Sequence, residues 1–131
     1  MNENQISRVV VATELHVHKR TGPGLLESVY EVILAHELKK RGLKVQRQAP
    51  IPIHYDDLVF EEGFRADLLV DEIVIVELKS VEKLVPVHHK HVLTQLRLSN
   101  RRLGLLINFG DVLLKHGLHR IANGMPDDVI H

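Results

Sequence analysis

The segment Ile73-Val74-Ile75-Val76-Glu77-Leu78-Lys79 decides the fold class of this 131-residue chain. Its first four residues are apolar on both faces, which predicts a central strand that is covered on both sides. The strand nevertheless finishes with Glu77 and Lys79, which are two positions apart and therefore on the same face. Buried charges are costly unless they are paired or bound to a metal, so this strand end is the first candidate site.

The stretch Phe64–Val70 lies close enough before this strand to form an antiparallel hairpin with it. It carries one acid, Asp67, among mostly apolar residues. If Asp67 lies opposite Glu77, the connection must be a three-residue loop at 71–73, whereas a two-residue turn would send the carboxylates to opposite faces. Metal chemistry favours the first register, because facing carboxylates repel each other unless a divalent cation lies between them.

Hydrophobic periodicity around this hairpin predicts an α/β domain with the order α-α-β-β-β-β-α-β. The expected helices are Ile6–Lys19, Leu25–Arg41 and Pro86–Ser99. The expected strands are Val45–Tyr55, Leu58–Glu61, Phe64–Val70, Ile73–Leu78 and Leu103–Phe109, with a short further strand near Val112–Lys115. The third helix can cross between two parallel strands, which gives a mixed central sheet flanked by helices.

Composition predicts one globular domain over residues 1–131, with a poorly ordered tail after about residue 123. The chain is 44% hydrophobic and has no cysteine, which excludes disulfide scaffolds, cysteine zinc sites and thiol nucleophiles. Basic and acidic residues number 17 each, so the whole protein has no basic field of the kind that binds nucleic acid non-specifically. The N-terminus lacks a signal-peptide pattern and no apolar run is long enough to span a bilayer, which predicts a cytoplasmic protein.

Charge is segregated along the chain despite this balance. Residues 56–82 carry nine acids against Arg65 and Lys79, whereas residues 86–102 carry four bases and no acid. Those bases are Lys90, Arg97, Arg101 and Arg102. They form either a solvated helix face or a track that binds the phosphate backbone of a nucleic acid.

The stretch Gly24-Leu25-Leu26-Glu27-Ser28-Val29-Tyr30 matches the signature G-x-x-E-x-x-Y, and the chain resembles the GxxExxY protein family from about Ile6 to Leu118. The resemblance also covers Arg65–Val70, Val74–Lys79 and Leu103–Gly110. That family looks like a compact branch of the PD-(D/E)XK nuclease superfamily, which implies a restriction-endonuclease-like core.

The resemblance implies a catalytic site made of Glu27, Asp67, Glu77 and Lys79. The three acids and the backbone carbonyl of Leu78 would bind Mg²⁺ or Mn²⁺, and the lysine would assist the attacking water. The implied function is metal-dependent hydrolysis of phosphodiester bonds in nucleic acid, with DNA as the first expected substrate.

Four further residues are expected to support this site or to pack beside it. His18 precedes the Gly22-Pro23-Gly24 turn, and Tyr30 shares a helix face with Glu27. His91 and Gln95 stand on the third helix where relatives commonly have Gln and Tyr. This departure, the neutral charge and the few aromatic residues favour an alternative hypothesis, a non-catalytic binding or assembly module that acts with a protein partner or as a homodimer.

Overall fold

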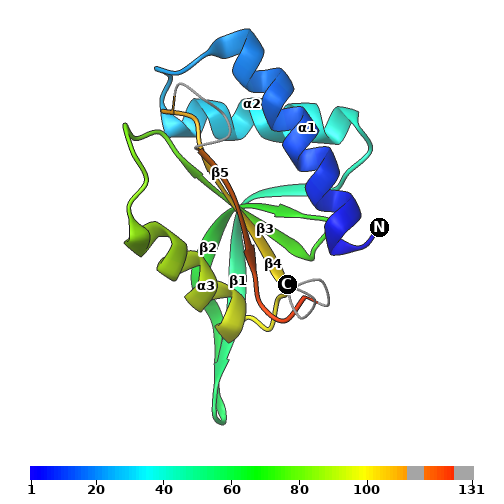
Figure 1. Ribbon diagram of the computed structural model, residues 1–131. Coiled ribbons are helices and arrows are strands. Elements are labelled where there is room, and N and C mark those ends of the chain that lie inside the picture. The colour runs from blue at the N-terminus through cyan, green and yellow to red at the C-terminus, as the bar shows by residue number, and fades with distance from the viewer. Residues whose placement is uncertain (112–116, 126–131) are drawn as a thin grey trace.

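The computed structural model describes residues 1–111 and 117–125 and arranges them as an α/β domain (Figure 1). The helices are α1 (Glu3–Thr21), α2 (Glu27–Lys40) and α3 (Pro86–Leu98). The strands are β1 (Val45–Tyr55), β2 (Leu58–Val70), β3 (Val74–Lys79), β4 (Leu103–Asn108) and β5 (Leu118–Ala122). This arrangement confirms the predicted α/β fold class. Two helices precede the strands of a mixed sheet in the sequence, and the third helix connects β3 to β4.

The five strands form one sheet in the order β1-β2-β3-β4-β5. β3 and β4 are parallel and are joined through α3, whereas all other neighbours are antiparallel. At the carboxyl ends of the parallel pair, Glu77 lies beside Leu106 and Lys79 lies beside Asn108. The expected crossover helix is therefore present, and it starts at the edge of the sheet where the candidate site lies.

Two strand predictions need correction. The expected strands Leu58–Glu61 and Phe64–Val70 are one strand, β2, because β1 pairs with it from the turn at 56–57 down to the body of the sheet. β5 is a strand that the sequence does not predict, because Leu118-His119-Arg120-Ile121-Ala122 contains two polar residues and lacks a clear apolar alternation. It forms at the edge of the sheet, where it pairs with β4. The strand expected near Val112–Lys115 lies outside the described residues.

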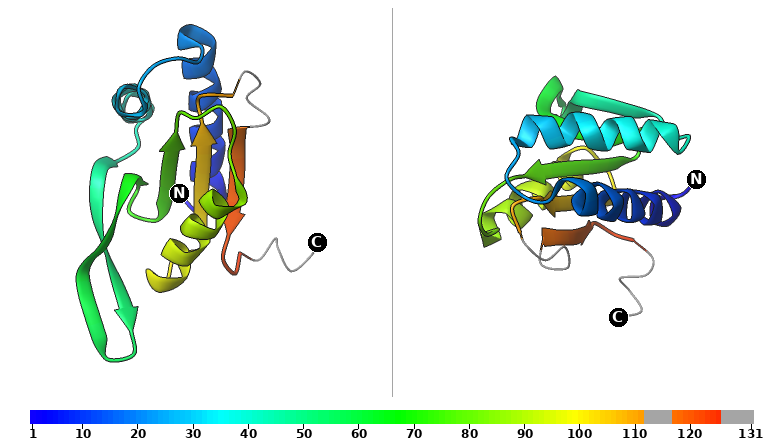
Figure 2. Two further views of the ribbon diagram at one scale, coloured as in Figure 1. Left: turned by 90° about the vertical axis from the view of Figure 1, so that its left-hand side faces the viewer. Right: turned by 90° about the horizontal axis from the view of Figure 1, so that it is seen from above.

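Each face of the sheet carries its own hydrophobic core. Figure 2 shows the helices that cover the two faces. α1 and α2 cover one face, where Val74, Val76 and Leu78 of β3 are buried. α3 covers the other face, where Ile75 is buried and where Gly104 lets the helix approach closely. A Cβ on that glycine would lie 2.9 Å from the Val92 side chain, so a larger residue would push the helix outward. By strand alternation, Glu77 and Lys79 lie on the α3 face.

Local sequence signals explain where the helices begin and end. Asn2 caps α1 in a capping box with Gln5, and Gly22 ends the helix with a φ of +68° that favours glycine. α2 starts at Glu27, two residues later than expected, which places that acid in the first turn of the helix. Met125 is buried in the core beneath α1 and α2, and the rest of the tail lies outside the described residues. Within the described chain, no helix is long and apolar enough to cross a membrane.

Candidate active site

The hairpin between β2 and β3 has the register that brings Asp67 and Glu77 together. Its Cα pairs are Leu68 with Val76, Leu69 with Ile75 and Val70 with Val74, and residues 71–73 form the connecting turn. Continued by one position, this register sets Asp67 opposite Glu77, so the predicted three-residue loop is confirmed. The Asp67 Oδ2 accepts a hydrogen bond from the backbone N–H of Leu78 at 2.8 Å, so this carboxylate points across the hairpin to the end of β3.

Glu77 is the most strongly perturbed group of the site. Burial, above all, and then the negative charge and the hydrogen bond of the Asp67 carboxylate together raise the pKa of Glu77 to about 8. Its Oε1 is shielded from water and has no hydrogen-bond partner among the described residues. Near neutral pH the Glu77 carboxyl therefore keeps its proton, which is the behaviour of a buried acid held beside a second carboxylate.

Glu27 approaches the same strand end from the first turn of α2. Burial raises the pKa of the Glu27 carboxyl, the positive charge of Lys79 lowers it, and the negative charge of Asp67 raises it. The backbone N–H of Ser80 donates to this carboxylate, and the Ser80 hydroxyl donates to the carbonyl of Leu25 at 2.9 Å. The segment after β3 is thus bonded directly to the start of α2, which places three acids and a lysine in one region.

A second layer of polar residues, which was not predicted from the sequence, lies behind this site. Glu31 lies one helical turn after Glu27, is buried, and accepts hydrogen bonds from Arg47 at 3.1 Å and from Gln48 at 2.5 Å. The Gln48 side chain also reaches Asp67 Oδ1 at 3.4 Å, from a residue with a φ of +50°. The four-residue spacing from Glu27 could have identified Glu31, but its partners on β1 come from the tertiary fold.

α3 closes the other side of the site. A small pocket of about 80 Å³ has Glu77 and Lys79 on one wall and His91 and Gln95 on the facing helix. The Gln95 Oε1 is buried and has no hydrogen-bond partner among the described residues, so it is an acceptor that a ligand can use. The structure therefore places both His91 and Gln95 next to the strand end that carries the acids.

Tyr30 shapes the turn before α2 and makes no hydrogen bond to the acids. Its hydroxyl donates to the carbonyl of Gly22 at 2.5 Å and accepts from the backbone N–H of Leu25 at 3.1 Å. The ring is fully buried and stacks on Phe109, with centroids 4.2 Å apart and an interplanar angle of 4°. Of the two roles expected for this residue, the structure shows the packing one, together with hydrogen bonds that fix the entry into α2.

Replacing Tyr30 with Phe should lower the free energy of unfolding by about 2 kcal/mol, because the two hydrogen bonds of its hydroxyl, to the Gly22 carbonyl and from the Leu25 N–H, are lost while the ring stacking remains. Urea denaturation followed by circular dichroism measures the change. The other tyrosine, Tyr55, is 63% exposed and provides the matched control, since its replacement by Phe should change stability by less than about 0.5 kcal/mol. Equal effects of the two substitutions would contradict the role of the Tyr30 hydroxyl.

His18 pairs with Glu14 inside α1. Its Nδ1 lies 3.9 Å from the Glu14 Oε1, and the Glu14 side chain is completely buried. Burial raises the pKa of Glu14 to about 7, and both carboxylate oxygens and the histidine Nδ1 lack hydrogen-bond partners among the described residues. The structure thus gives His18 a buried acid as its neighbour, and none of its described contacts is with the strand-end carboxylates.

The four expected nucleic-acid-binding bases separate into two groups. Lys90 and Arg97 are exposed on α3, whose neighbouring residues line the small pocket. Arg101 and Arg102 precede β4 and line a separate surface pocket with Glu72, at the end of the sheet where β3 begins. Arg101 is also partly buried, which lowers its pKa. The structure therefore does not place Arg101 and Arg102 beside Glu77 and Lys79, which lie at the opposite end of β3.

The mixed sheet, with Glu77 and Lys79 at the end of the buried strand β3 and Asp67 beside them on β2, is consistent with a nuclease-like domain. The profile of the PD-(D/E)XK nuclease superfamily matches residues 4–121, and the chain belongs to this superfamily. No curated protein and no solved structure matches the chain.

Proposed function

We propose that this protein is a Mg²⁺- or Mn²⁺-dependent nuclease that hydrolyses phosphodiester bonds, with DNA as its substrate. The observation that supports the proposal most directly is the convergence of the Asp67 and Glu77 carboxylates at the end of β3, with Lys79 two residues further on. Membership of the superfamily supports it independently. The G-x-x-E-x-x-Y signature at Gly24–Tyr30 supports placement in the GxxExxY branch.

The acids present fit a divalent cation. Within residues 1–111 and 117–125, no three Asp, Glu or His side chains are already spaced to hold an ion. Mg²⁺ needs only one or two carboxylates, because it keeps several of its waters. Asp67 and Glu77 supply such a pair, and the unpartnered Oε1 of Glu77 is an acceptor that a cation would satisfy. Glu27 and the carbonyl of Leu78 are the proposed additional ligands.

Asp67, Glu77 and Glu27 would hold a divalent cation at the strand end. When bound, such a cation would supply Lewis-acid stabilisation of the charge that builds up on the phosphate. The Lys79 ammonium group orients the attacking water and donates to a phosphate oxygen as negative charge develops there. His91 and Gln95 line the adjoining pocket and are proposed to donate to the same phosphate group.

The substrate backbone is proposed to lie across the exposed side of α3. Lys90 and Arg97 would contact phosphates there, because both are exposed on the helix that forms one wall of the site. Arg101 and Arg102 lie at the other end of β3, so they would contact only a nucleic acid long enough to extend that far from the site. Binding through such contacts should weaken as the salt concentration rises.

Incubation of the purified protein with labelled DNA and RNA, with Mg²⁺, Mn²⁺ or a chelator, tests the proposal. We expect cleavage that requires the metal and that is lost in the variant Asp67→Ala. The corresponding change at Glu62, an exposed acid on the same strand, should leave cleavage intact. Folded protein that cleaves no substrate with either metal would rule out the enzyme.

The alternative, a non-catalytic binding or assembly module, is favoured by one observation, the lack of a ready-made three-ligand group among the described residues. Calorimetric titration with Mn²⁺ separates the two functions. We expect binding that the variant Glu77→Gln loses, because this substitution removes one of the two central carboxylates. No heat of binding at millimolar Mn²⁺ would support the module instead.

A further inference from the structure

The β1–β2 hairpin extends well beyond the rest of the sheet. β3 pairs with β2 only over Leu68–Val70, so no third strand of the described part of the chain lies beside the outer part of the hairpin. Figures 1 and 2 show this part, residues 52–63, as a two-stranded projection from the body; we call it the hairpin arm. A two-stranded ribbon is only marginally stable in water, so a projection of this length gains stability when another surface covers it.

The surface of the hairpin arm is both apolar and acidic. Four of its apolar side chains are between 48% and 63% exposed: Tyr55, Leu58, Val59 and Phe60. The arm also carries four acids, which are Asp56, Asp57, Glu61 and Glu62. It contains no lysine or arginine. An acidic arm repels nucleic acid and anionic membranes, whereas its exposed apolar side chains are typical of a protein contact.

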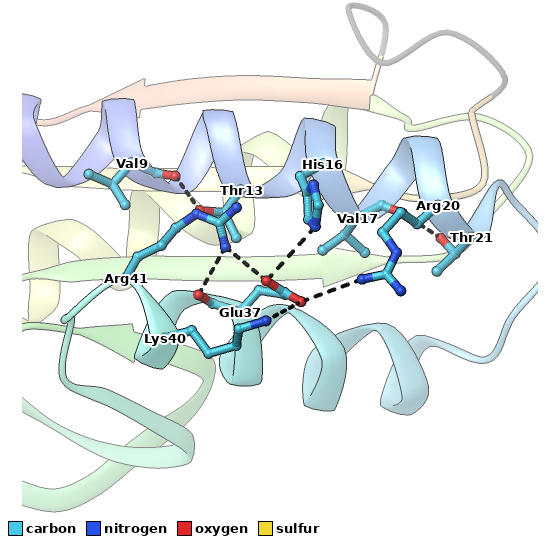
Figure 3. A network of polar contacts seen from close by, with 9 residues as sticks. All are labelled: Val9, Thr13, His16, Val17, Arg20, Thr21, Glu37, Lys40 and Arg41. Carbon is cyan, nitrogen blue, oxygen red and sulfur yellow. Dashed lines mark hydrogen bonds and ion pairs between the residues drawn. The ribbon is translucent and has the colours of Figure 1, made fainter.

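A basic groove lies between α1 and α2, on a different part of the molecule. It encloses a pocket of about 400 Å³, with Val17 and Ile33 among its apolar lining. His16 and Arg20 project into it from α1, and Lys40 projects into it from α2 (Figure 3). The groove therefore combines an apolar floor with a basic rim, which is the complement of the arm.

The charges in the basic groove are not balanced internally. The side chain of Glu37 is only 8% exposed. Its carboxylate forms ion pairs with Arg41 at 2.9 Å, with Lys40 at 3.5 Å and with Arg20 at 3.9 Å. His16 Nε2 lies 4.0 Å from the same carboxylate. One carboxylate cannot neutralise three permanent cations, and Arg20 and Lys40 are 68% and 58% exposed at the rim. The groove therefore presents excess positive charge to solvent.

We propose that this protein forms a symmetric homodimer in which the hairpin arm of each copy lies in the basic groove of the other. The arm supplies the carboxylates that the three cations lack, and its apolar side chains cover the floor of the groove. A two-fold arrangement uses each contact twice and leaves neither feature unpaired, which is the usual geometry of homodimers. Charge complementarity of this kind also fixes the partner and the register of docking.

Sedimentation of the full chain at concentrations up to about 100 µM tests the proposal. The wild-type protein should reach twice the mass of one chain. The arm variant, Asp57→Lys with Glu61→Lys, and the groove variant, Arg20→Glu with Lys40→Glu, should each weaken the dimer by about 100-fold. Asp57 and Glu61 make no described contact within the chain, so the arm variant should stay folded, as circular dichroism can verify. The variant Arg8→Glu, on the same helix as Arg20, should still dimerise.

An equimolar mixture of the arm variant and the groove variant gives the decisive result. In the mixed dimer both contacts regain opposite charges, so we expect the mass of a dimer at a concentration at which each variant alone is monomeric. A monomeric wild type, a mixture that stays monomeric, or dimerisation unaffected by either variant would overturn the proposal. A monomeric wild type whose groove variant loses affinity for DNA would assign the groove to nucleic acid instead.

Discussion

Replacing Lys79 with Met should reduce DNA cleavage by at least about 100-fold while Mn²⁺ binding is retained. Lys79 is not a proposed metal ligand, so its loss removes a donor to the water and the phosphate and leaves the carboxylates in place. Its positive charge lies near Glu27 and Glu77 and opposes a bound cation, so the affinity for Mn²⁺ should stay equal or increase. Single-turnover cleavage and calorimetric titration measure the two quantities separately.

Two comparisons make this test specific. Lys83→Met removes an exposed lysine from the loop that follows Lys79, and it should leave both cleavage and Mn²⁺ binding unchanged. Asp67→Asn should remove binding and cleavage together, because it takes away a carboxylate of the central pair. Loss of Mn²⁺ binding in Lys79→Met would show that this lysine organises the site and would contradict the role proposed for it.

Replacing Glu77 with Gln should increase the free energy of unfolding at pH 8 by several kcal/mol and remove metal binding at the same time. The pKa of Glu77 is raised in the folded protein from its ordinary value of 4.5 to about 8, first by burial and then by Asp67. The folded state therefore holds a proton that the unfolded chain releases above pH 4.5. Stability is fully present below that pH and is lost as the pH rises toward 8, in the absence of metal.

Urea denaturation at a series of pH values in a chelating buffer checks this prediction. The wild type should lose stability between pH 4.5 and 8, and Glu77→Gln should flatten much of that slope. Glu14 also contributes to the slope, because burial raises its pKa to about 7; the variant Glu14→Gln should therefore reduce the slope only between pH 4.5 and 7, where the contribution of Glu77 remains. Identical pH profiles for the wild type and Glu77→Gln would show that the Glu77 carboxyl is not buried beside Asp67.

The short segments that carry the chemistry were predictable from the sequence because their signals are local. Apolar periodicity identified the three helices and the central strand, and the metal chemistry expected of Asp67 and Glu77 selected the three-residue loop that the structure shows. The reason is physical: strand alternation and loop length together fix which face a side chain occupies. The resemblance to nucleases identified Glu27, which the structure brings near Asp67 and Lys79.

Other features depend on contacts between segments far apart in the chain, and only the tertiary structure decided them. Glu31 became part of the site through β1, because Gln48 joins it to Asp67. β5 is a strand because β4 offers it an edge, although its own sequence is largely polar. Arg101 belongs to the opposite end of the sheet because α3 runs back along the sheet before β4 begins.

The same distinction applies to the two surfaces of the proposed dimer. The acids of the hairpin arm lie close together in the sequence and can be recognised there. Their exposure to solvent, however, follows from the length by which β1 and β2 extend past β3. The basic groove is assembled from α1 and α2, whose bases are spread over 26 positions from His16 to Arg41. The sequence determines the individual helices and strands through short-range periodicity. The packing of those helices and strands decides which charged side chains share a surface.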